Sequence, residues 1–231
     1  MQTYPISSDM IIRILGTGGV ISSQIMNLSV IPSLIEIIRS GSTLAYPSFP
    51  VIIGLTNAIH NILYALSRSD EYVIISSVVS FILYAIYFCV HARYVRDSRS
   101  FLRQFFYFPF LSTILSMIML EFLNDFTCLT PNGITDCINR SSDPLGSFST
   151  IISTLSYCGQ LTTIRRIIRT KDASSISPWM TGGVLLRAST WFLYSYMIDD
   201  KFYLISTSVG IVSALVQIGL LINYRRRKRL D

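Results

Sequence analysis

Seven long apolar runs dominate this chain of 231 residues and constrain its fold more than any other feature. Their approximate bounds are residues 11–38, 49–66, 72–90, 105–123, 148–168, 178–198 and 202–224. Each is near the roughly 20 residues that an α-helix needs to cross a bilayer. The sequence is 51% hydrophobic and only 14% charged, which is too apolar for an ordinary soluble domain of this size. Because the runs lack the alternation of barrel strands, we predict an all-α membrane protein with seven transmembrane helices.

Basic residues predict which way these helices cross the membrane. They gather after the third run, after the fifth run and in the tail, which all lie on one side: Arg93, Arg96, Arg99 and Arg103; Arg165, Arg166, Arg169 and Lys171; and Arg225, Arg226, Arg227, Lys228 and Arg229. The positive-inside rule places this side in the cytosol, so we expect the N-terminus outside and the C-terminus inside. The membrane is either the plasma membrane or an endomembrane. The net charge of +6 then reflects topology, and no nucleic-acid partner is expected.

The outer loop between the fourth and fifth runs combines two cysteines with a glycosylation sequon. Cys128 and Cys137 face a compartment that permits a disulfide, so a bonded pair and two free thiols both stay open. Asn139, Arg140 and Ser141 form an N-x-S sequon on the side that the charge rule makes external. We therefore predict glycosylation at Asn139.

A second copy of the first three helices follows later in the chain. Ile37-Ile38-Arg39 recurs as Ile167-Ile168-Arg169, an offset of 167 minus 37, or 130. Ile75-Ser76-Ser77 recurs at the same offset as Ile205-Ser206-Thr207. Unrelated apolar helices are not expected to hold one register across polar loops. We predict two parallel three-helix bundles joined by a linker helix, a 3+1+3 order. The segments are residues 10–97 (first repeat), 98–147 (linker helix and outer loop), 148–224 (second repeat) and 225–231 (basic cytosolic tail).

Parallel internal repeats are typical of membrane transporters that bind substrate near the membrane midplane between the copies. A seven-helix receptor has the same number of spans but is not expected to carry such a copy. An intramembrane hydrolase needs a nucleophile beside a base. The sequence offers no such pair, no metal-spaced cluster and no phosphate-binding loop at membrane depth. We therefore predict a transporter and not an enzyme, with no cofactor and no metal.

Polar residues in the second helix of each copy are the candidate substrate contacts. At the offset of 130, Asn57 corresponds to Arg187 and Asn61 to Trp191, and a spacing of four residues places each pair on one helical face. The third helices add two hydroxyl residues, Ser77 and Thr207. Amides and hydroxyls hydrogen bond to sugar hydroxyls, while an indole ring stacks on the C–H face of a pyranose. Structural roles stay open beside this one: Trp191 as packing, and Arg187 as a donor to Asn57 or to backbone carbonyls.

Both copies also resemble the SWEET family of sugar transporters. The stretch Ser29 to Thr43 (SVIPSLIEIIRSGST), followed by Pro50, Asn57 and Tyr64, resembles the first repeat of that family. Arg165 to Ser195 (RRIIRTKDASSISPWMTGGVLLRASTWFLYS) resembles the second, with its Thr-Lys-Ser loop, its proline and its Ser-Trp-x-x-Tyr-Gly ending. The resemblance implies a sugar substrate, a substrate site between the repeats and a homo-oligomer.

Departures from the family pattern concern the substrate contacts. The family has an asparagine in each third helix, where this sequence has Ser77 and Thr207, and a tryptophan in the first repeat, where it has Asn61. Trp191 keeps its place, whereas Arg187 lies where the family usually has a small or polar residue. Substrate identity is therefore open, although we expect the architecture to hold.

We expect bidirectional facilitated diffusion (uniport) of mono- or disaccharides by alternating access. No aspartate or glutamate lies near the midplane to bind a coupling ion. Pro50 and Pro178 are the expected hinges. Two alternatives stay open: a carrier of an organic or sugar acid that binds Arg187, and a sorting receptor of related fold. Such a receptor is expected to have several arginines near its cavity mouth, whereas this sequence offers only Arg187.

Overall fold

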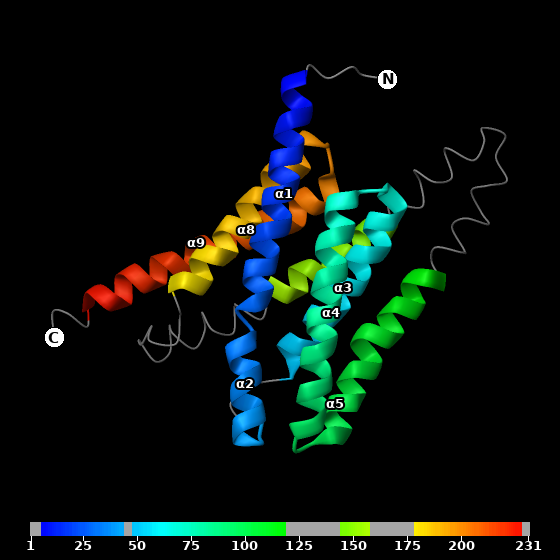
Figure 1. Ribbon diagram of the computed structural model, residues 1–231, viewed down its shortest axis with the longest axis vertical. Coiled ribbons are helices and arrows are strands. Elements are labelled where there is room, and N and C mark those ends of the chain that lie inside the picture. The colour runs from blue at the N-terminus through cyan, green and yellow to red at the C-terminus, as the bar shows by residue number, and fades with distance from the viewer. Residues whose placement is uncertain (1–5, 44–47, 119–143, 158–177, 228–231) are drawn as a thin grey trace. The chain divides into compact units, whose positions relative to one another are not determined.

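The computed structural model describes residues 6–43, 48–118, 144–157 and 178–227, and every regular element in these ranges is a helix (Figure 1). The helices are α1 (Ile6–Leu28), α2 (Ile31–Ser40), α3 (Phe49–Arg68), α4 (Glu71–Tyr94), α5 (Ser98–Phe105), the π-helix η1 (Phe106–Leu111), α8 (Pro178–Met197) and α9 (Lys201–Arg227). Residues 112–118 and 144–157 are helical as well. Cys128, Cys137 and Asn139 lie outside the described residues, so the disulfide and the glycan stay predictions.

Five helical stretches in the described part are long and apolar enough to cross a membrane: Asp9–Ser40, Phe49–Arg68, Glu71–Tyr94, Ser98–Ile118 and Lys201–Asn223. They coincide with the first four apolar runs and the seventh. The 20-residue helix α8 is not among the five, because Arg187 and several hydroxyl and glycine residues lower its mean hydropathy. The prediction of an all-helical multi-pass membrane protein is confirmed.

The first apolar run was expected to form one helix, but it is broken between Leu28 and Ile31. Proline lacks a backbone N–H, and inside a continuous helix its ring would clash with the carbonyl four residues earlier, which for Pro32 is that of Leu28. Pro32 therefore lies in the first turn of α2, where the missing N–H costs nothing. On the other side of the break, the Ser29 hydroxyl donates to the Met26 carbonyl at 2.6 Å.

Two compact units share the helices. Unit 1 comprises Met1–Ser29 and Thr154–Asp231, and unit 2 comprises Val30–Ser153. The units therefore cut across the two sequence repeats, since each contains helices from both copies. The boundaries assigned to the repeats remain sequence predictions.

Unit 2 is built around α3 and α4, which pack along each other, with α2 against α4 and η1 against α3. Ile37, Val51 and Tyr87 are buried together at the centre of one apolar cluster. Gly54 allows close approach of the two long helices, because a Cβ at this position would overlap the ring of Tyr84.

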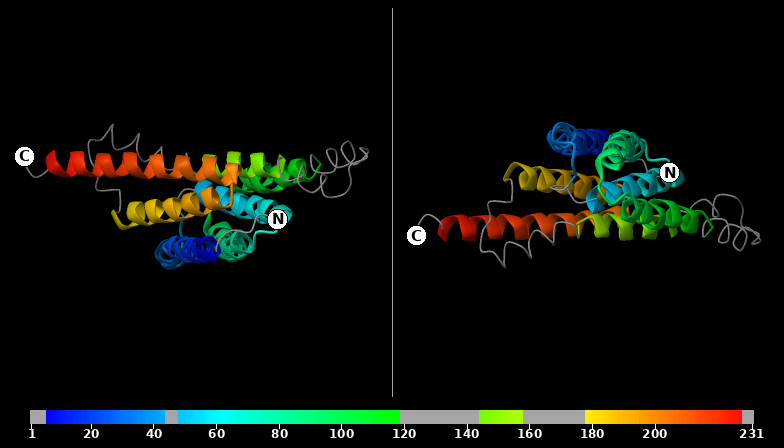
Figure 2. Two further views of the ribbon diagram at one scale, coloured as in Figure 1. Left: turned by 90° about the horizontal axis from the view of Figure 1, so that it is seen from above. Right: turned by 90° about the horizontal axis from the view of Figure 1, so that it is seen from below.

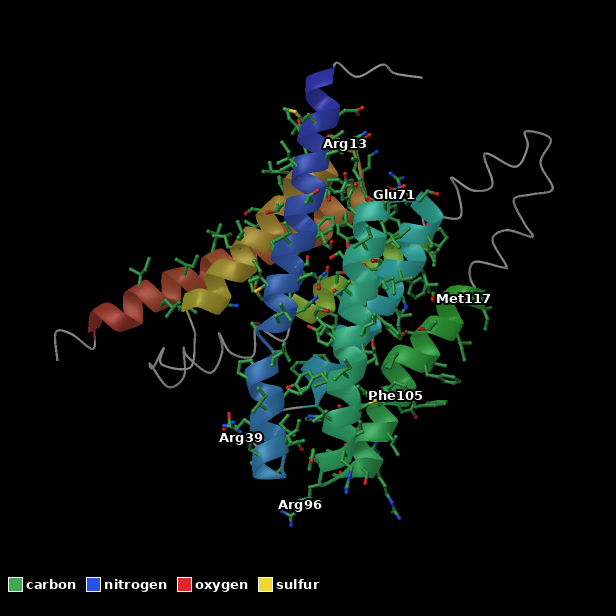
Figure 3. All side chains as sticks on the ribbon, in the orientation of Figure 1. Arg13, Arg39, Glu71, Arg96, Phe105 and Met117 are labelled. Carbon is green, nitrogen blue, oxygen red and sulfur yellow. The ribbon has the colours of Figure 1, made fainter. Side chains whose placement is uncertain are left out.

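Charged residues of unit 2 lie mainly toward the ends of its helices. Figure 3 shows Glu71 at one end of α4 and Arg96 beyond the other, with Arg39 of α2 at the same end as Arg96. Phe105 and Met117, also labelled there, mark the course of the next span, Ser98–Ile118. Charged ends with an apolar middle are the arrangement expected of a bundle that crosses a bilayer, because charged side chains are costly inside it.

Unit 1 is built around α8, which packs against both α1 and α9. Both views in Figure 2 show α8 and α9 side by side. Small residues allow this packing on the α1 side: a Cβ at Gly19 would meet the Trp191 ring, and a Cβ at Gly183 would meet the Met26 sulfur at 2.7 Å. Small residues at helix contacts are typical of membrane bundles, where backbones must approach closely.

The turn between the second and third helix is the same in both copies. Ser69 and Asp199, 130 residues apart, adopt the left-handed conformation with φ of 53° and 55°. Asp70 and Asp200 follow, and each carboxylate accepts the backbone N–H three residues later at 3.1 Å. These are N-caps, which satisfy donors that a helix start leaves free. The copy seen in the sequence is thus also a copy of local structure.

Candidate functional site

Asn57 and Asn61 lie on one face of α3, as their spacing predicts, and both are hydrogen bonded. Ser153, in the helical segment 144–157, donates to Asn57 Oδ1 at 2.7 Å. Ser149, one turn earlier, donates to Asn61 Oδ1 at 2.6 Å, and both residues of this second pair are buried. Each amide oxygen thus has a partner, whereas no hydrogen bond engages the amide nitrogens in the described part of the chain, so these can donate to a ligand.

Arg187 and Trp191 lie on the corresponding face of α8, and both side chains donate to one residue, Ser23 of α1. The distances to Ser23 Oγ are 3.1 Å from Arg187 Nε and 2.8 Å from Trp191 Nε1. Within unit 1, the partner of this nitrogen is therefore a serine hydroxyl and not a backbone carbonyl, which was one of the structural roles that the sequence left open. In the described part of the chain, no carboxylate forms an ion pair with Arg187.

The Trp191 ring is enclosed within unit 1. It is 3% exposed, contacts Tyr194 edge-on at 5.5 Å between ring centroids, and contacts Tyr203 at 5.7 Å. Gly19 of α1 leaves room for it, because a Cβ there would lie 2.9 Å from Trp191 Cε2. In this conformation the indole packs inside the bundle, so its role as a sugar contact remains a proposal.

The first-helix residues that contact these side chains are also related by the sequence offset of 130. Ser23 corresponds to Ser153, and Gly19 corresponds to Ser149. In unit 2, Ser149 contacts Asn61, whereas in unit 1, Gly19 lies against Trp191. The smaller first-helix residue, Gly19, thus lies against the larger second-helix residue, Trp191.

These four first-helix partners were missed from the sequence. Laying the first helices of the two copies on each other at the same offset pairs Ser23 with Ser153 and marks both as candidates. Which second-helix residues they contact could not be predicted, because that depends on how the helices pack.

Ser77 and Thr207 are buried on the third helices, at 5% and 4% exposure. The Thr207 hydroxyl donates to the Tyr203 carbonyl of its own helix at 2.7 Å, and its neighbour Ser206 donates to the same carbonyl at 3.0 Å. Such bonds satisfy a hydroxyl in an apolar environment without a ligand. Among the described residues of each unit, Ser77 does not hydrogen bond to the polar side chains of α3, and Thr207 does not hydrogen bond to those of α8.

The two expected hinge prolines lie at helix starts. Pro50 is in the first turn of α3, and Pro178 is the first residue of α8. Proline is favoured there because it removes a donor that has no partner anyway. Neither residue kinks a helix interior, and their role in motion stays a prediction.

His60 and possible metal ligands are the remaining candidates for site chemistry in the part of the chain that the structure describes. His60 is 1% exposed, and its Nδ1 lies 2.9 Å from the Thr56 carbonyl of its own helix. No group of three or more histidine, cysteine or acidic side chains could hold a metal ion there. The polar pair on α3 in unit 2 and the polar pair on α8 in unit 1 are the candidate substrate contacts.

Comparison with known proteins decides the family. The model of a family described as "Sugar efflux transporter for intercellular exchange" matches residues 13–99 and again residues 143–229. The chain belongs to this family. The two matched segments begin at residues 13 and 143, a difference of 143 minus 13, or 130 residues. This is the same offset as that between the two copies in the sequence. It is a family of transporters and not of enzymes.

Several SWEET proteins match most of the chain. Bidirectional sugar transporter SWEET12 of Oryza sativa subsp. japonica is 23% identical over 215 residues, which are 93% of this chain and 68% of the relative. Sugar transporter SWEET1 of Drosophila pseudoobscura pseudoobscura is 22% identical over 215 residues, covering 93% of this chain and 90% of the relative. Bidirectional sugar transporter SWEET1a of Sorghum bicolor is 26% identical over 216 residues, covering 92% and 77%.

A solved structure shares the fold. The 3.7 Å structure of a eukaryotic SWEET transporter superposes with a TM-score of 0.78 at 15% sequence identity, covering 95% of this chain and 99% of the other. The predicted 3+1+3 helical order is thereby confirmed.

Proposed function

We propose that this protein carries mono- or disaccharides across a membrane by bidirectional uniport with alternating access. The observation that carries the proposal is the match of the sugar-transporter family to both copies of the repeat. The relatives named above are themselves called sugar transporters, two of them bidirectional.

The proposed substrate contacts come from the second and third helices of both repeats: Trp191, Asn61, Asn57, Ser77, Thr207 and Arg187. The hydrogen bonds of the asparagines support this role, because Ser149 and Ser153 occupy their amide oxygens and hold the amide nitrogens in one orientation. A preorganised donor binds a sugar hydroxyl at lower entropic cost than a mobile one. Pro50 and Pro178 are the proposed hinges.

Uniport is favoured by where the acidic residues lie. In the described ranges, all of them are at or near helix ends: Asp9, Glu36, Asp70, Glu71, Asp97, Asp199 and Asp200. Carriers coupled to an ion commonly bind it with a carboxylate in the membrane interior. Transport then runs down the sugar gradient without energy input.

Uptake by proteoliposomes tests the proposal. Purified protein is reconstituted, and radiolabelled glucose, fructose and sucrose are offered with and without an imposed proton gradient. We expect uptake and counterflow of at least one sugar in both conditions. Uptake that requires the gradient refutes uniport, and absence of uptake for every sugar refutes sugar transport.

A matched pair of variants ties the activity to the site. Asn61→Ala removes a proposed contact and leaves the buried Ser149 hydroxyl without its acceptor, so kcat/KM should fall about tenfold. Asn223→Ala makes the same change at an exposed position near the end of α9 and should have no effect. Equal uptake by both variants contradicts the proposed site.

A second candidate substrate is an organic or sugar acid, and the environment of Arg187 favours it. The partner of its Nε is the neutral Ser23 hydroxyl, so the charge is not compensated by an acid in the described part. A guanidinium binds a carboxylate with two parallel hydrogen bonds. Arg187→Thr separates the two substrates: neutral sugar uptake should survive it, whereas uptake of glucuronate should vanish if the acid is the substrate.

The proposal extends to topology and assembly. It places the N-terminus outside and the C-terminus in the cytosol, in the plasma membrane or an endomembrane. It also includes a glycan on Asn139 and a homo-oligomer as the functional assembly. Enzymatic deglycosylation of protein from cells, with Asn139→Gln as control, tests the side of that loop. Light scattering in detergent measures the oligomer.

A further inference from the structure

One buried hydroxyl holds both chemically distinctive residues of α8. Ser23 is 0% exposed, and its Oγ accepts from Trp191 Nε1 at 2.8 Å and from Arg187 Nε at 3.1 Å. A serine hydroxyl has two acceptor positions and one hydrogen. The two N–H groups use both acceptor positions, so Ser23 is saturated as an acceptor.

These bonds restrict what each α8 side chain can offer. The indole N–H is consumed, so Trp191 can present only its ring to a ligand. Arg187 has five N–H donors, and using Nε–H leaves the four N–H donors of its two terminal nitrogens. Both side chains are thereby oriented from a single point on the neighbouring helix.

The other copy lacks this double contact. Ser153, the counterpart of Ser23, donates its own hydrogen to Asn57 Oδ1. Asn61 is held separately, by Ser149. In the second repeat, Ser149 and Ser153 each bind one residue of the facing helix, whereas in the first repeat Ser23 alone binds two.

We propose that Ser23 is a positioning residue that couples the orientation of Trp191 to that of Arg187, and so sets substrate selectivity through both. The proposal rests on the proposed function, since it assigns Ser23 an effect on the same site. Ser23 itself touches no substrate. It acts through its two donors, and removing its oxygen releases both at once.

Tryptophan fluorescence tests the positioning without any transport. The chain has two tryptophans, so Trp179→Phe leaves Trp191 as the only one that is excited at wavelengths where tyrosine does not absorb. In that background, Ser23→Ala removes the acceptor of the indole N–H and should shift the Trp191 emission to shorter wavelength. Ser22→Ala is the matched control, because the Ser22 hydroxyl is buried next door but donates to the Gly19 carbonyl of its own helix at 3.0 Å.

The result that overturns the positioning is a folded Ser23→Ala protein whose emission equals that of Ser22→Ala. Should Ser23→Ala fail to fold, Ser23→Cys gives the same readout, because a thiol fills the space but accepts only weakly. Ser23→Thr keeps the hydroxyl and should retain the emission of the parent.

A double-mutant cycle on transport tests the coupling. Ser23→Ala alone should lower kcat/KM for the transported sugar about tenfold, which corresponds to about 1.4 kcal/mol. In the Trp191→Phe background, which lacks the indole N–H, the same change should cost clearly less, because one of its two targets is gone. Additive losses show a merely structural effect and refute the coupling. If the parent transports no sugar, the proposed function fails, whereas the fluorescence result still decides the positioning of Trp191.

Discussion

Replacing Gly19 by serine should destabilise unit 1 through a clash with Trp191. A Cβ at Gly19 would lie 2.9 Å, 3.0 Å and 3.1 Å from Cε2, Cδ2 and Cζ2 of the indole, distances that real Cβ atoms scarcely show. The ring cannot swing away, because Ser23 holds its N–H and Tyr203 contacts its ring. Overpacking of this kind costs about 1–3 kcal/mol. Removing a helical glycine returns only roughly 0.5–1 kcal/mol.

Thermal and denaturant unfolding of the purified protein in detergent measures this loss. Gly182→Ser is the matched control, since it makes the same change in a helix where nothing lies within 4 Å of the new Cβ. We expect the Gly19 variant to unfold at lower temperature than the parent and the Gly182 variant to equal or exceed it.

A second substitution tests the cause. Gly19→Ser combined with Trp191→Asn recreates the serine–asparagine pair that Ser149 and Asn61 form in the other copy, at 2.6 Å. Trp191→Asn alone leaves a cavity that costs about 3–5 kcal/mol. The double variant should be more stable than the sum of the single losses by about 1–3 kcal/mol, because the clash is gone and a hydrogen bond can form. Strict additivity, or a Gly19→Ser protein as stable as its control, refutes the packing argument.

Two further predictions concern features that position the site. Asp70→Ala and Asp200→Ala each remove an N-cap of the same geometry, so each should cost about 1 kcal/mol in unfolding experiments, whereas asparagine at either position should retain most of it. Gly54→Ala should destabilise unit 2, because the new Cβ would lie 2.6 Å from Tyr84 Cζ, and Tyr84→Ala in the same chain should relieve that clash. Loss of stability at only one of the two caps, or no relief by the second substitution, would contradict these structural assignments.

The fold was largely predictable, because its main constraint is local. A run of about 20 apolar residues must satisfy its backbone groups internally, so a helix follows from composition alone. The copy at offset 130 was visible from Ile37-Ile38-Arg39 and its repeat, and the family match begins at the same interval. The break before Pro32 was less evident, because the apolar run continues across it.

The site was predictable in part. Spacing of four residues placed Asn57 with Asn61 and Arg187 with Trp191, and the structure keeps each pair on one helix face. Their partners were not predictable, because a serine among many serines carries no local signal of what it contacts. The enclosure of the Trp191 ring is likewise a property of the packed bundle.

By itself the sequence determined helix type, the repeat and the polar faces of α3 and α8, since these follow from periodicity and from the energetic cost of polar groups in hydrocarbon. Tertiary structure alone decided that Ser23 binds both Arg187 and Trp191, while Ser149 and Ser153 divide the two asparagines. The reason is physical: a hydrogen bond depends on a distance of about 3 Å between groups up to 168 residues apart, and only the packing of helices sets that distance.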